Sequence, residues 1–176
     1  MEAELGFLNL LQRLHSPVMD RIMCLITHLG DAGVVWIVLC GALLLYPKTR
    51  VYALSVGCAL ILDAVVCNQI LKPFFCRVRP CDLNPAVRLL IPRPSDYSFP
   101  SGHTAASFAV VSALFFAGEQ KLCLSSLVVA GLIAFSRMYL YVHYPTDILG
   151  GVILGWLSGW VGNWLAGMIL KFTVHP

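Results

Sequence analysis

The sequence predicts an all-α membrane protein, a polytopic bundle of transmembrane helices in a single domain that covers residues 1–176. Hydrophobic residues make up 59% of the chain and charged residues only 12%. The apolar residues are grouped in runs near the ~20 residues that cross a bilayer as an α-helix. Open strands would leave backbone groups unsatisfied in hydrocarbon, which favours helices. Five spans are predicted, near residues 32–47, 52–71, 102–118, 122–141 and 148–170.

Residues 1–30 precede the first predicted span, and we expect them to form two amphipathic helices at the membrane interface. Apolar side chains between positions 7 and 14 share one helical face, and a Ser-Pro pair at position 16 restarts a second helical segment. A cleavable signal peptide would begin with positive charge, whereas this chain begins with Glu2 and Glu4. The alternative is that residues 18–28 enter the bilayer as a short additional span.

The first polar motif is Lys-Pro-Phe-Phe-Cys-Arg-Val-Arg-Pro at Lys72–Pro80. Lys72 ends the second predicted span and Arg79 follows in the loop, so an ammonium and a forked guanidinium can hold different oxygens of one phosphate. The alternative is that both side chains reach lipid headgroups. Asp63 lies deeper in the same span, where a carboxylate is costly, and we expect it to face a polar partner inside the bundle.

The second motif is Pro-Ser-Gly-His at Pro100–His103, where a polar loop meets an apolar helix. Free N–H groups at a helix start attract anions, Gly102 lets the backbone approach oxygen, and the Ser101 hydroxyl donates or caps. His103 follows directly and can donate a proton to a leaving oxygen. The alternative is a plain serine cap beside an interfacial histidine.

The third motif covers Ser136–Asp147. Arg137 adds a further cation near the end of the fourth predicted span, and Pro145 suits the first position of the fifth helix. If helical geometry begins near His143, the Asp147 carboxylate reaches the imidazole and fixes its tautomer, so that a neutral ring nitrogen can attack phosphorus. The alternative is a helix cap by Asp147.

Together the three segments resemble the patterns K-x6-R-P, P-S-G-H and S-R-x5-H-x3-D of the type 2 phosphatidic acid phosphatase superfamily, in its membrane-integral bacterial lipid phosphatase branch. The resemblance covers residues 72–147. It implies a helical bundle that needs no metal or other cofactor. It also implies that His143 is the nucleophile forming a phosphohistidine, that Asp147 orients it, and that His103 is the acid. The residues implied to bind phosphate are Lys72, Arg79, Ser101, Gly102, His103 and Arg137.

The expected activity is hydrolysis of phosphate from a membrane lipid, because a site at the membrane edge with no large cap suits a substrate whose tail stays in the bilayer. Undecaprenyl diphosphate, phosphatidylglycerol phosphate and phosphatidic acid are the candidate substrates. Arg88 and Arg93 could receive a second phosphate, which slightly favours a diphosphate or a broad lipid phosphatase. The alternatives are a phosphotransferase that uses an acceptor other than water and, less favoured, an anion transporter.

Loop charges predict a multi-pass protein of the cell membrane with its active site on the extracytoplasmic side. Lys48, Lys121 and Lys171 fall on one side of the predicted spans, which the positive-inside rule makes cytoplasmic. The other side is richer in cations, and we attribute that excess to anion binding. A net charge of +3, without a basic helix interleaved with aromatics, argues against a nucleic-acid partner.

Two further patterns concern packing and cysteine chemistry. Glycines at positions 151, 155 and 159 form a close-packing stripe in the last span, for which packing within the chain is favoured over a dimer contact, and the oligomeric state is left open. Seven cysteines include no pair with the spacing of a zinc site. Cys76 and Cys81 flank a loop where either a disulfide or two free thiols fits the spacing.

Overall fold

The structure is a computed structural model that describes residues 2–174. Within that range the protein contains helices and no strand. The all-α prediction is therefore confirmed. The α-helices in chain order are α1 (Glu2–Leu11), α2 (Pro17–Leu29), α3 (Val34–Leu45), α4 (Arg50–Val65), α5 (Lys72–Phe75), α6 (Pro80–Leu83), α7 (Gly102–Phe116), α8 (Gln120–Tyr139) and α9 (Pro145–Val174). A π-helical segment, Val66–Leu71, joins α4 to α5.

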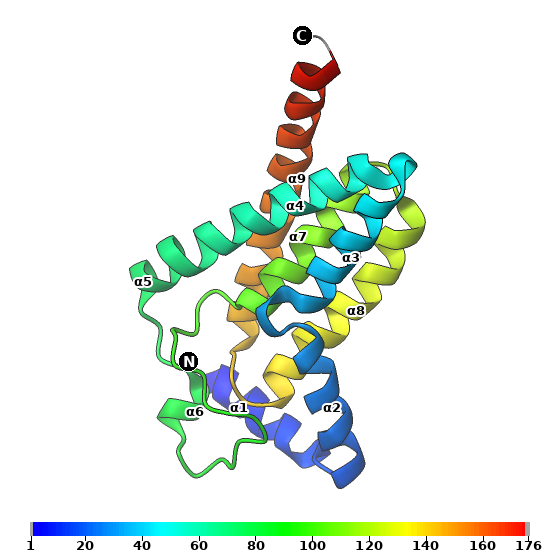
Figure 1. Cartoon of the computed structure of the whole chain (residues 1–176). Helices are drawn as coiled ribbons and strands as arrows, with labels where there is room; N and C mark the ends of the chain where they lie inside the picture. The colour runs from blue at the N-terminus through cyan, green and yellow to red at the C-terminus, as the bar shows by residue number, and fades with distance from the viewer. Residues whose placement is uncertain (1, 175–176) are drawn as a thin grey trace.

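Helix α7 lies at the centre of the bundle, with α3, α4, α8 and α9 around it (Figure 1). The glycine stripe of α9 packs against α7 at backbone contact distance. A Cβ atom on Gly155 would stand 2.3 Å from the carbonyl oxygen of Ala105, and one on Gly159 would stand 2.6 Å from that of Ala109. Only glycine permits this approach, so the stripe packs within the chain, as favoured from the sequence.

Two buried clusters hold the fold together. The first fills the bundle between α3, α4, α7 and α8 and includes Trp36, whose Nε1 donates to Ser107 Oγ at 3.0 Å. The second lies under the loop between α8 and α9, where Leu8 of α1 and Met23 of α2 pack against Tyr139 and its neighbours. The second cluster fixes the amino-terminal helices against the segment that carries the third motif.

The five predicted spans are found only in part. Three helical stretches of the described chain are long and apolar enough to cross a membrane: Pro47–Leu83, Gln120–Tyr139 and Pro145–Phe172. A fourth is counted if α2 and α3, which meet at a 47° bend, form one broken span. The bend falls where Ala32 and Gly33 adopt left-handed backbone conformations, with φ values of 50° and 69°. Helix α7, with 15 residues, is shorter than a typical span.

Residues 2–30 contain the two helices α1 and α2, while their amphipathic placement at the membrane interface stays a prediction. Helix α2 begins as its sequence indicates: the side chain of Ser16 accepts a hydrogen bond from the backbone of Met19 at 3.3 Å, and Pro17 takes the first helical position. Because α2 leads into α3 at the bend, the alternative in which residues 18–28 belong to a span stays open.

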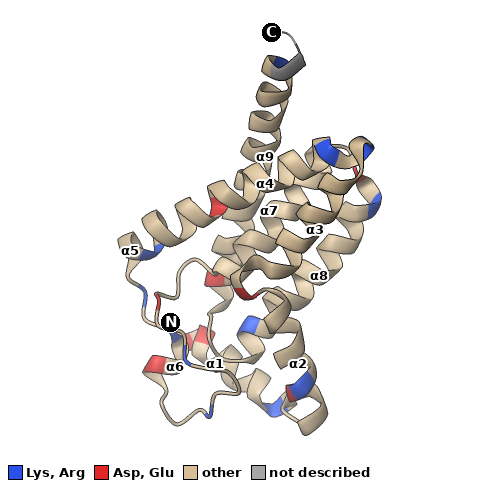
Figure 2. Ribbon diagram, viewed as in Figure 1, with Lys and Arg blue, Asp and Glu red and all other residues tan. Residues whose placement is uncertain are grey.

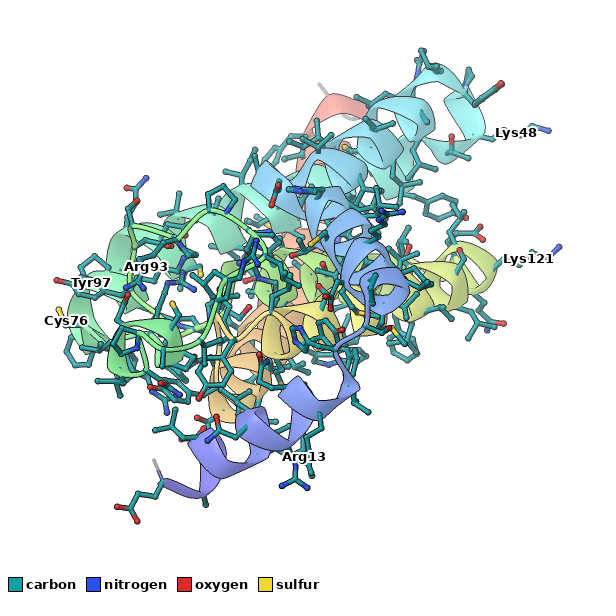
Figure 3. All side chains as sticks on the ribbon, turned by 90° about the horizontal axis from the view of Figure 1, so that it is seen from below. Arg13, Lys48, Cys76, Arg93, Tyr97 and Lys121 are labelled. Carbon is teal, nitrogen blue, oxygen red and sulfur yellow. The ribbon has the colours of Figure 1, made fainter. Side chains whose placement is uncertain are left out.

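Charged residues gather at the two ends of the molecule and leave the middle of the bundle nearly free of them (Figure 2). Lys48 and Lys121 project from one side, while Cys76, Arg93 and Tyr97 lie at the opposite side (Figure 3). The apolar band between these sides has the character of a membrane-embedded layer. The chain is therefore a membrane protein whose three polar motifs all lie toward one side.

Candidate active site

The three motifs meet around a cavity of about 350 Å³ at the end of the bundle opposite Lys48 and Lys121. Side chains from the start of α5, the start of α7, the end of α8 and the loop before α9 reach this cavity. Segments far apart in the sequence therefore form one site. The sequence-predicted residues that line it are Lys72, Arg79, Gly102, His103, Arg137 and His143. Ser101 and Asp147 lie just outside its lining.

Lys72 and Arg79 are buried and share one carboxylate partner, Asp96. The Lys72 ammonium pairs with Oδ2 of Asp96, and Arg79 Nη2 donates to Oδ1 at 2.7 Å. Arg79 Nε also donates to the Asp96 backbone carbonyl at 2.8 Å. Burial alone would raise the pKa of the Asp96 carboxyl, but Lys72 and Arg79 hold that pKa below its usual range. An ionised Asp96 therefore occupies the two cations expected to hold phosphate.

Sequence reasoning missed Asp96. Its signal was an acidic residue in an arginine-rich loop, placed shortly before the Pro-Ser-Gly-His segment. Asp96 is half-exposed and lines the cavity, so an anionic ligand that enters there would compete with its carboxylate for Lys72 and Arg79.

We expect Asp96→Asn to strengthen binding of orthovanadate, an anion of phosphate-like shape. The amide removes the competing charge from Lys72 and Arg79, so the inhibition constant should fall by about tenfold, equivalent to ~1.4 kcal/mol. Inhibition curves for purified protein in detergent measure this effect, with Glu2→Gln at an exposed position of α1 as the control. An unchanged or higher inhibition constant would show that Asp96 instead helps to orient the cations in the bound state.

Arg137 brings a further cation to the cavity from the end of α8. Its Nη1 donates to Thr27 Oγ1 of α2, which fixes the guanidinium. Its Nε has no hydrogen-bond partner among residues 2–174. A buried donor without a partner is costly, and an oxygen of a ligand in the cavity would satisfy it.

His143 is buried and stands between Asp147 and Arg79. Its Nδ1 lies 3.4 Å from Asp147 Oδ2, and its Nε2 lies 3.1 Å from Arg79 Nη1. Since a guanidinium nitrogen can only donate, Nε2 must accept, which places the ring proton on Nδ1 toward the carboxylate. Burial and then the charge of Arg79 lower the pKa of His143 well below its usual value, so the ring is neutral at pH 7. A lone pair on Nε2 thus lies beside the cations.

Asp147 is fully buried in the first turn of α9, which begins at Pro145 as predicted. Its Oδ2 accepts hydrogen bonds from the Tyr144 backbone at 2.9 Å and from Ser98 Oγ at 2.5 Å, and its Oδ1 accepts from Arg77 Nη1 at 2.5 Å. The carboxylate therefore both caps the helix and contacts the histidine. The two alternatives considered for Asp147, a partner of His143 and a helix cap, are thus compatible. The partnership with Arg77 and Ser98 was not predicted.

The Pro-Ser-Gly-His segment begins α7, and of the two roles expected for the Ser101 hydroxyl, donor or cap, the structure contradicts only the cap. Its side chain makes no capping hydrogen bond, and its Oγ instead accepts from Thr104 Oγ1 at 3.0 Å. Gly102 does lie next to the cations, because a Cβ atom there would stand 3.5 Å from Lys72 Nζ. The start of α7 thus adjoins the ammonium, while the Ser101 hydroxyl is turned toward its own helix.

His103 lines the cavity and is held by a carboxylate that sequence reasoning missed. Its Nε2 lies 2.9 Å from Asp31 Oδ1, and the other oxygen of Asp31 lies 2.7 Å from His28 Nδ1. Asp31 comes from the bend between α2 and α3, and its only signal in the sequence was one acidic residue beside a long apolar run. The pairing fixes where the imidazole of His103 stands.

An apolar groove of about 690 Å³ adjoins the cation cavity and shares Lys72, Asp96, Gly102 and His103 with it. Its other walls come chiefly from apolar and small residues of α3 and α4. Asp63 lines the groove together with Asn68 and Lys72, as expected for a residue that faces polar groups, although its Oδ1 has no hydrogen-bond partner within the described chain. A polar site that continues into an apolar groove suits a ligand with one charged and one apolar part.

The remaining sequence predictions have mixed outcomes. Arg93 lines the cation cavity and pairs with Asp82 at 2.6 Å, whereas Arg88 lines a separate cavity with residues of α1 and its flanks. The structure therefore does not bring the two arginines together to receive one phosphate. Cys76 is exposed, Cys81 is buried and both are free thiols, which agrees with the second of the two alternatives.

The fold and the site define an all-helical membrane protein with a cation-lined cavity that holds a paired histidine and aspartate. The chain belongs to the PAP2 superfamily, whose family model matches residues 52–170. All three motifs lie within that range, so the resemblance noted in the sequence is confirmed.

Relatives and solved structures agree with this assignment. An undecaprenyl-diphosphatase from Sulfolobus acidocaldarius is 30% identical over 125 residues, which are 70% of this chain but only 60% of that protein. Phosphatidylglycerophosphatase B from Bacillus subtilis is 33% identical over 156 residues, 82% of this chain and 73% of that one. The crystal structure of Aquifex aeolicus LpxE matches with a TM-score of 0.78 at 28% identity, over 91% of this chain and 94% of the other.

Proposed function

We propose that this protein removes phosphate from a membrane lipid phosphate or diphosphate through a phosphohistidine formed on His143. The observation that carries the proposal is the position of Nε2: its lone pair stands among Lys72, Arg79 and Arg137, while Nδ1 faces Asp147. A nucleophile beside preorganised cations is the arrangement that phosphoryl transfer requires.

The first step of the proposed reaction transfers the phosphoryl group to the enzyme. Nε2 of His143 attacks phosphorus, and the bond between phosphorus and the leaving oxygen of the lipid breaks. His103, protonated at the outset and paired with Asp31, gives one proton to that oxygen and becomes neutral, while Asp147 stabilises the positive charge that appears on the His143 ring.

The second step returns the enzyme to its starting state. Water attacks phosphorus, the bond to Nε2 breaks, and His103 takes up one proton from the water as phosphate forms. The cations Lys72, Arg79 and Arg137, with the backbone at Gly102, bind the nonreacting oxygens through both steps. Asp96 must leave Lys72 and Arg79 first, because one pair of cations cannot hold two anions in the same place.

The groove and the relatives support the proposed substrate class. The apolar groove between α3 and α4 would hold lipid chains while the phosphate reaches the cations. Proteins similar to this chain are named for undecaprenyl diphosphate and phosphatidylglycerophosphate. We therefore keep undecaprenyl diphosphate, phosphatidylglycerol phosphate and phosphatidic acid as candidate substrates. Release of phosphate from a panel of these lipids by purified protein tests the proposal.

We expect the reaction to proceed without a metal ion, because the cations and backbone donors take the place that a metal would hold on the phosphate. Phosphate release should continue in EDTA and should be blocked by orthovanadate, which can adopt a five-coordinate form like the transition state. Loss of activity in EDTA with recovery on adding Mg²⁺ or Zn²⁺ would contradict this mechanism.

We also propose that the site faces the extracytoplasmic side and that α7 and the bent pair α2–α3 complete a five-span bundle. In a background without native cysteines, Ala86→Cys in the site-side loop should react with an impermeant thiol reagent on intact cells. Gln120→Cys at the opposite end should react only after permeabilisation. Labelling of Gln120→Cys alone in intact cells would reverse the orientation.

A further inference from the structure

Arg77 lies outside the lining of the phosphate cavity, yet its guanidinium contacts the carboxylate behind the proposed nucleophile. It comes from the segment between α5 and α6. Its Nη1 donates to Asp147 Oδ1 at 2.5 Å and to Thr146 Oγ1 at 2.7 Å, and its Cζ stands 4.0 Å from the centre of the Tyr144 ring. The guanidinium is thus fixed against the first turn of α9 by two hydrogen bonds and a cation–π contact.

The second carboxylate on Arg77 belongs to Glu4 of α1. Arg77 Nη2 donates to Glu4 Oε2 at 2.7 Å, and Glu4 Oε1 accepts from Thr146 Oγ1 at 2.5 Å and from the Thr146 backbone at 3.2 Å. Although burial opposes it, these hydrogen bonds and the charge of Arg77 lower the pKa of the Glu4 carboxyl, so Glu4 is ionised at neutral pH. Through Glu4, helix α1 therefore forms hydrogen bonds both with Arg77 and with Thr146 in the first turn of α9.

Helix α1 is itself held firmly enough to position Glu4. One and two turns further on, Leu8 and Leu11 are buried in the cluster around Tyr139 and Tyr141. The Tyr141 hydroxyl also donates to Asn9 Oδ1 at 2.8 Å. These contacts join α1 to the same loop that carries His143.

A buried carboxylate requires compensation of its charge, and His143 is neutral before the reaction. Arg77 supplies this compensation on Oδ1 of Asp147, which leaves Oδ2 for Ser98, the Tyr144 backbone and the imidazole. Without Arg77 the carboxylate loses the partner that holds Oδ1 and can rotate, which weakens its hold on the ring proton at Nδ1. The tautomer that presents a lone pair at Nε2 would then be less populated.

We propose that Arg77 and Glu4 are positioning residues of the catalytic centre. Glu4 holds Arg77, Arg77 holds Asp147, and Asp147 orients His143, so α1 contributes to catalysis through Glu4. The proposal rests on the proposed function, because it assigns its effect to the nucleophile. A phosphate-binding residue would affect substrate affinity. Arg77, by contrast, should affect the rate of reaction of bound substrate and leave substrate affinity nearly unchanged.

Steady-state kinetics of lipid phosphate hydrolysis test the proposal in the full-length protein in detergent. Arg77→Gln should lower kcat by about 100-fold and change KM by less than about threefold. Arg77→Lys should recover part of the loss, since a cation returns without the fork. Glu4→Gln should lower kcat by about tenfold, and adding it to Arg77→Gln should cost little more, because the two act in series. The controls Arg13→Gln and Glu2→Gln remove exposed charges of the same amino-terminal segment and should leave kcat unchanged.

Several outcomes overturn the proposal. A rise in KM with kcat unchanged would make Arg77 a substrate-binding residue, and wild-type kcat in Arg77→Gln would leave it no part in the reaction. If Arg77→Gln does not fold, as judged by its melting temperature, the comparison of Glu4→Gln with Glu2→Gln decides, and equal kcat values reject the proposal. Failure of the proposed function is separate: it appears in wild-type protein as hydrolysis of no lipid phosphate or as no label on His143.

Discussion

Replacing His143 with alanine should abolish turnover, with kcat lowered by more than ~1,000-fold. The expected loss is this large because alanine removes the proposed nucleophile, and the group next to Nε2, Arg79 Nη1 at 3.1 Å, is a cation that cannot attack phosphorus. Phosphate release from lipid substrate by purified His143→Ala protein measures the effect. If a well-folded sample keeps more than about a hundredth of wild-type kcat, covalent catalysis by this residue is wrong.

Asp147→Asn is the matched comparison for His143→Ala. It preserves the volume of the side chain and keeps a carbonyl oxygen that can face the ring, so part of the activity should survive, at a level between the alanine variant and wild type. Both variants should keep a melting temperature and a gel-filtration profile like those of wild type, which separates lost chemistry from lost folding.

Arg79→Lys should cost both rate and affinity and lower kcat/KM by about 100-fold, or ~2.7 kcal/mol. Arg79 is buried and uses several of its donors at once: Nη1 contacts His143 and the Val142 carbonyl, while Nε and Nη2 reach Asp96. A lysine ammonium is a single point and cannot span these positions. Charge that grows on the phosphate oxygens in the transition state would therefore lose a fixed partner.

Arg88→Lys is the control for this variant, because Arg88 lines a separate cavity beside α1 and should tolerate the change. Equal kinetics for Arg79→Lys and wild type would mean that the fork of Arg79 serves only the fold. A loss confined to KM would mean that its contacts with phosphate do not strengthen in the transition state.

The site could be predicted where its geometry is local. His143 and Asp147 are four residues apart, and because His143 lies only two residues before the start of α9, the carboxylate in the first turn of that helix stays close to the ring. Lys72 and Arg79 could be expected at one phosphate because a short loop joins them. The conformation of Ser101 could not be read in this way, since its hydroxyl has a nearby alternative partner in Thr104.

The partners that the sequence did not show are joined across long separations. Asp31 reaches His103, Asp96 reaches Lys72 and Glu4 reaches Arg77 only because the bundle brings their segments together. An acidic residue in a loop carries no sign of the cation it will meet, so these contacts follow from tertiary packing and not from spacing. Asp31, Asp96 and Glu4 each pair with a cation or a histidine in or beside the site. These three carboxylates therefore balance part of its positive charge.

The fold was predictable in class but not in the number of spans. Hydropathy identifies the long stretches that contain α4, α8 and α9, because each is apolar over a length that matches a bilayer. The bend at Ala32 and Gly33 falls where the first predicted span begins, but hydropathy does not show whether the helices on its two sides form one broken span. Helix α7 is apolar along its 15 residues but shorter than a typical span, so its place in the membrane stays a prediction.

The central claim is that the phosphoryl group passes through His143, and trapping the intermediate tests it most directly. Purified protein is mixed with a lipid phosphate that carries a labelled phosphoryl group, quenched within milliseconds in alkali, where a phosphohistidine survives, and digested for mass spectrometry. The account predicts label on the peptide that contains His143, loss of that label in acid, and no label in His143→Ala. Label on another residue, or turnover by wild-type protein without any labelled intermediate at the earliest times, would contradict it.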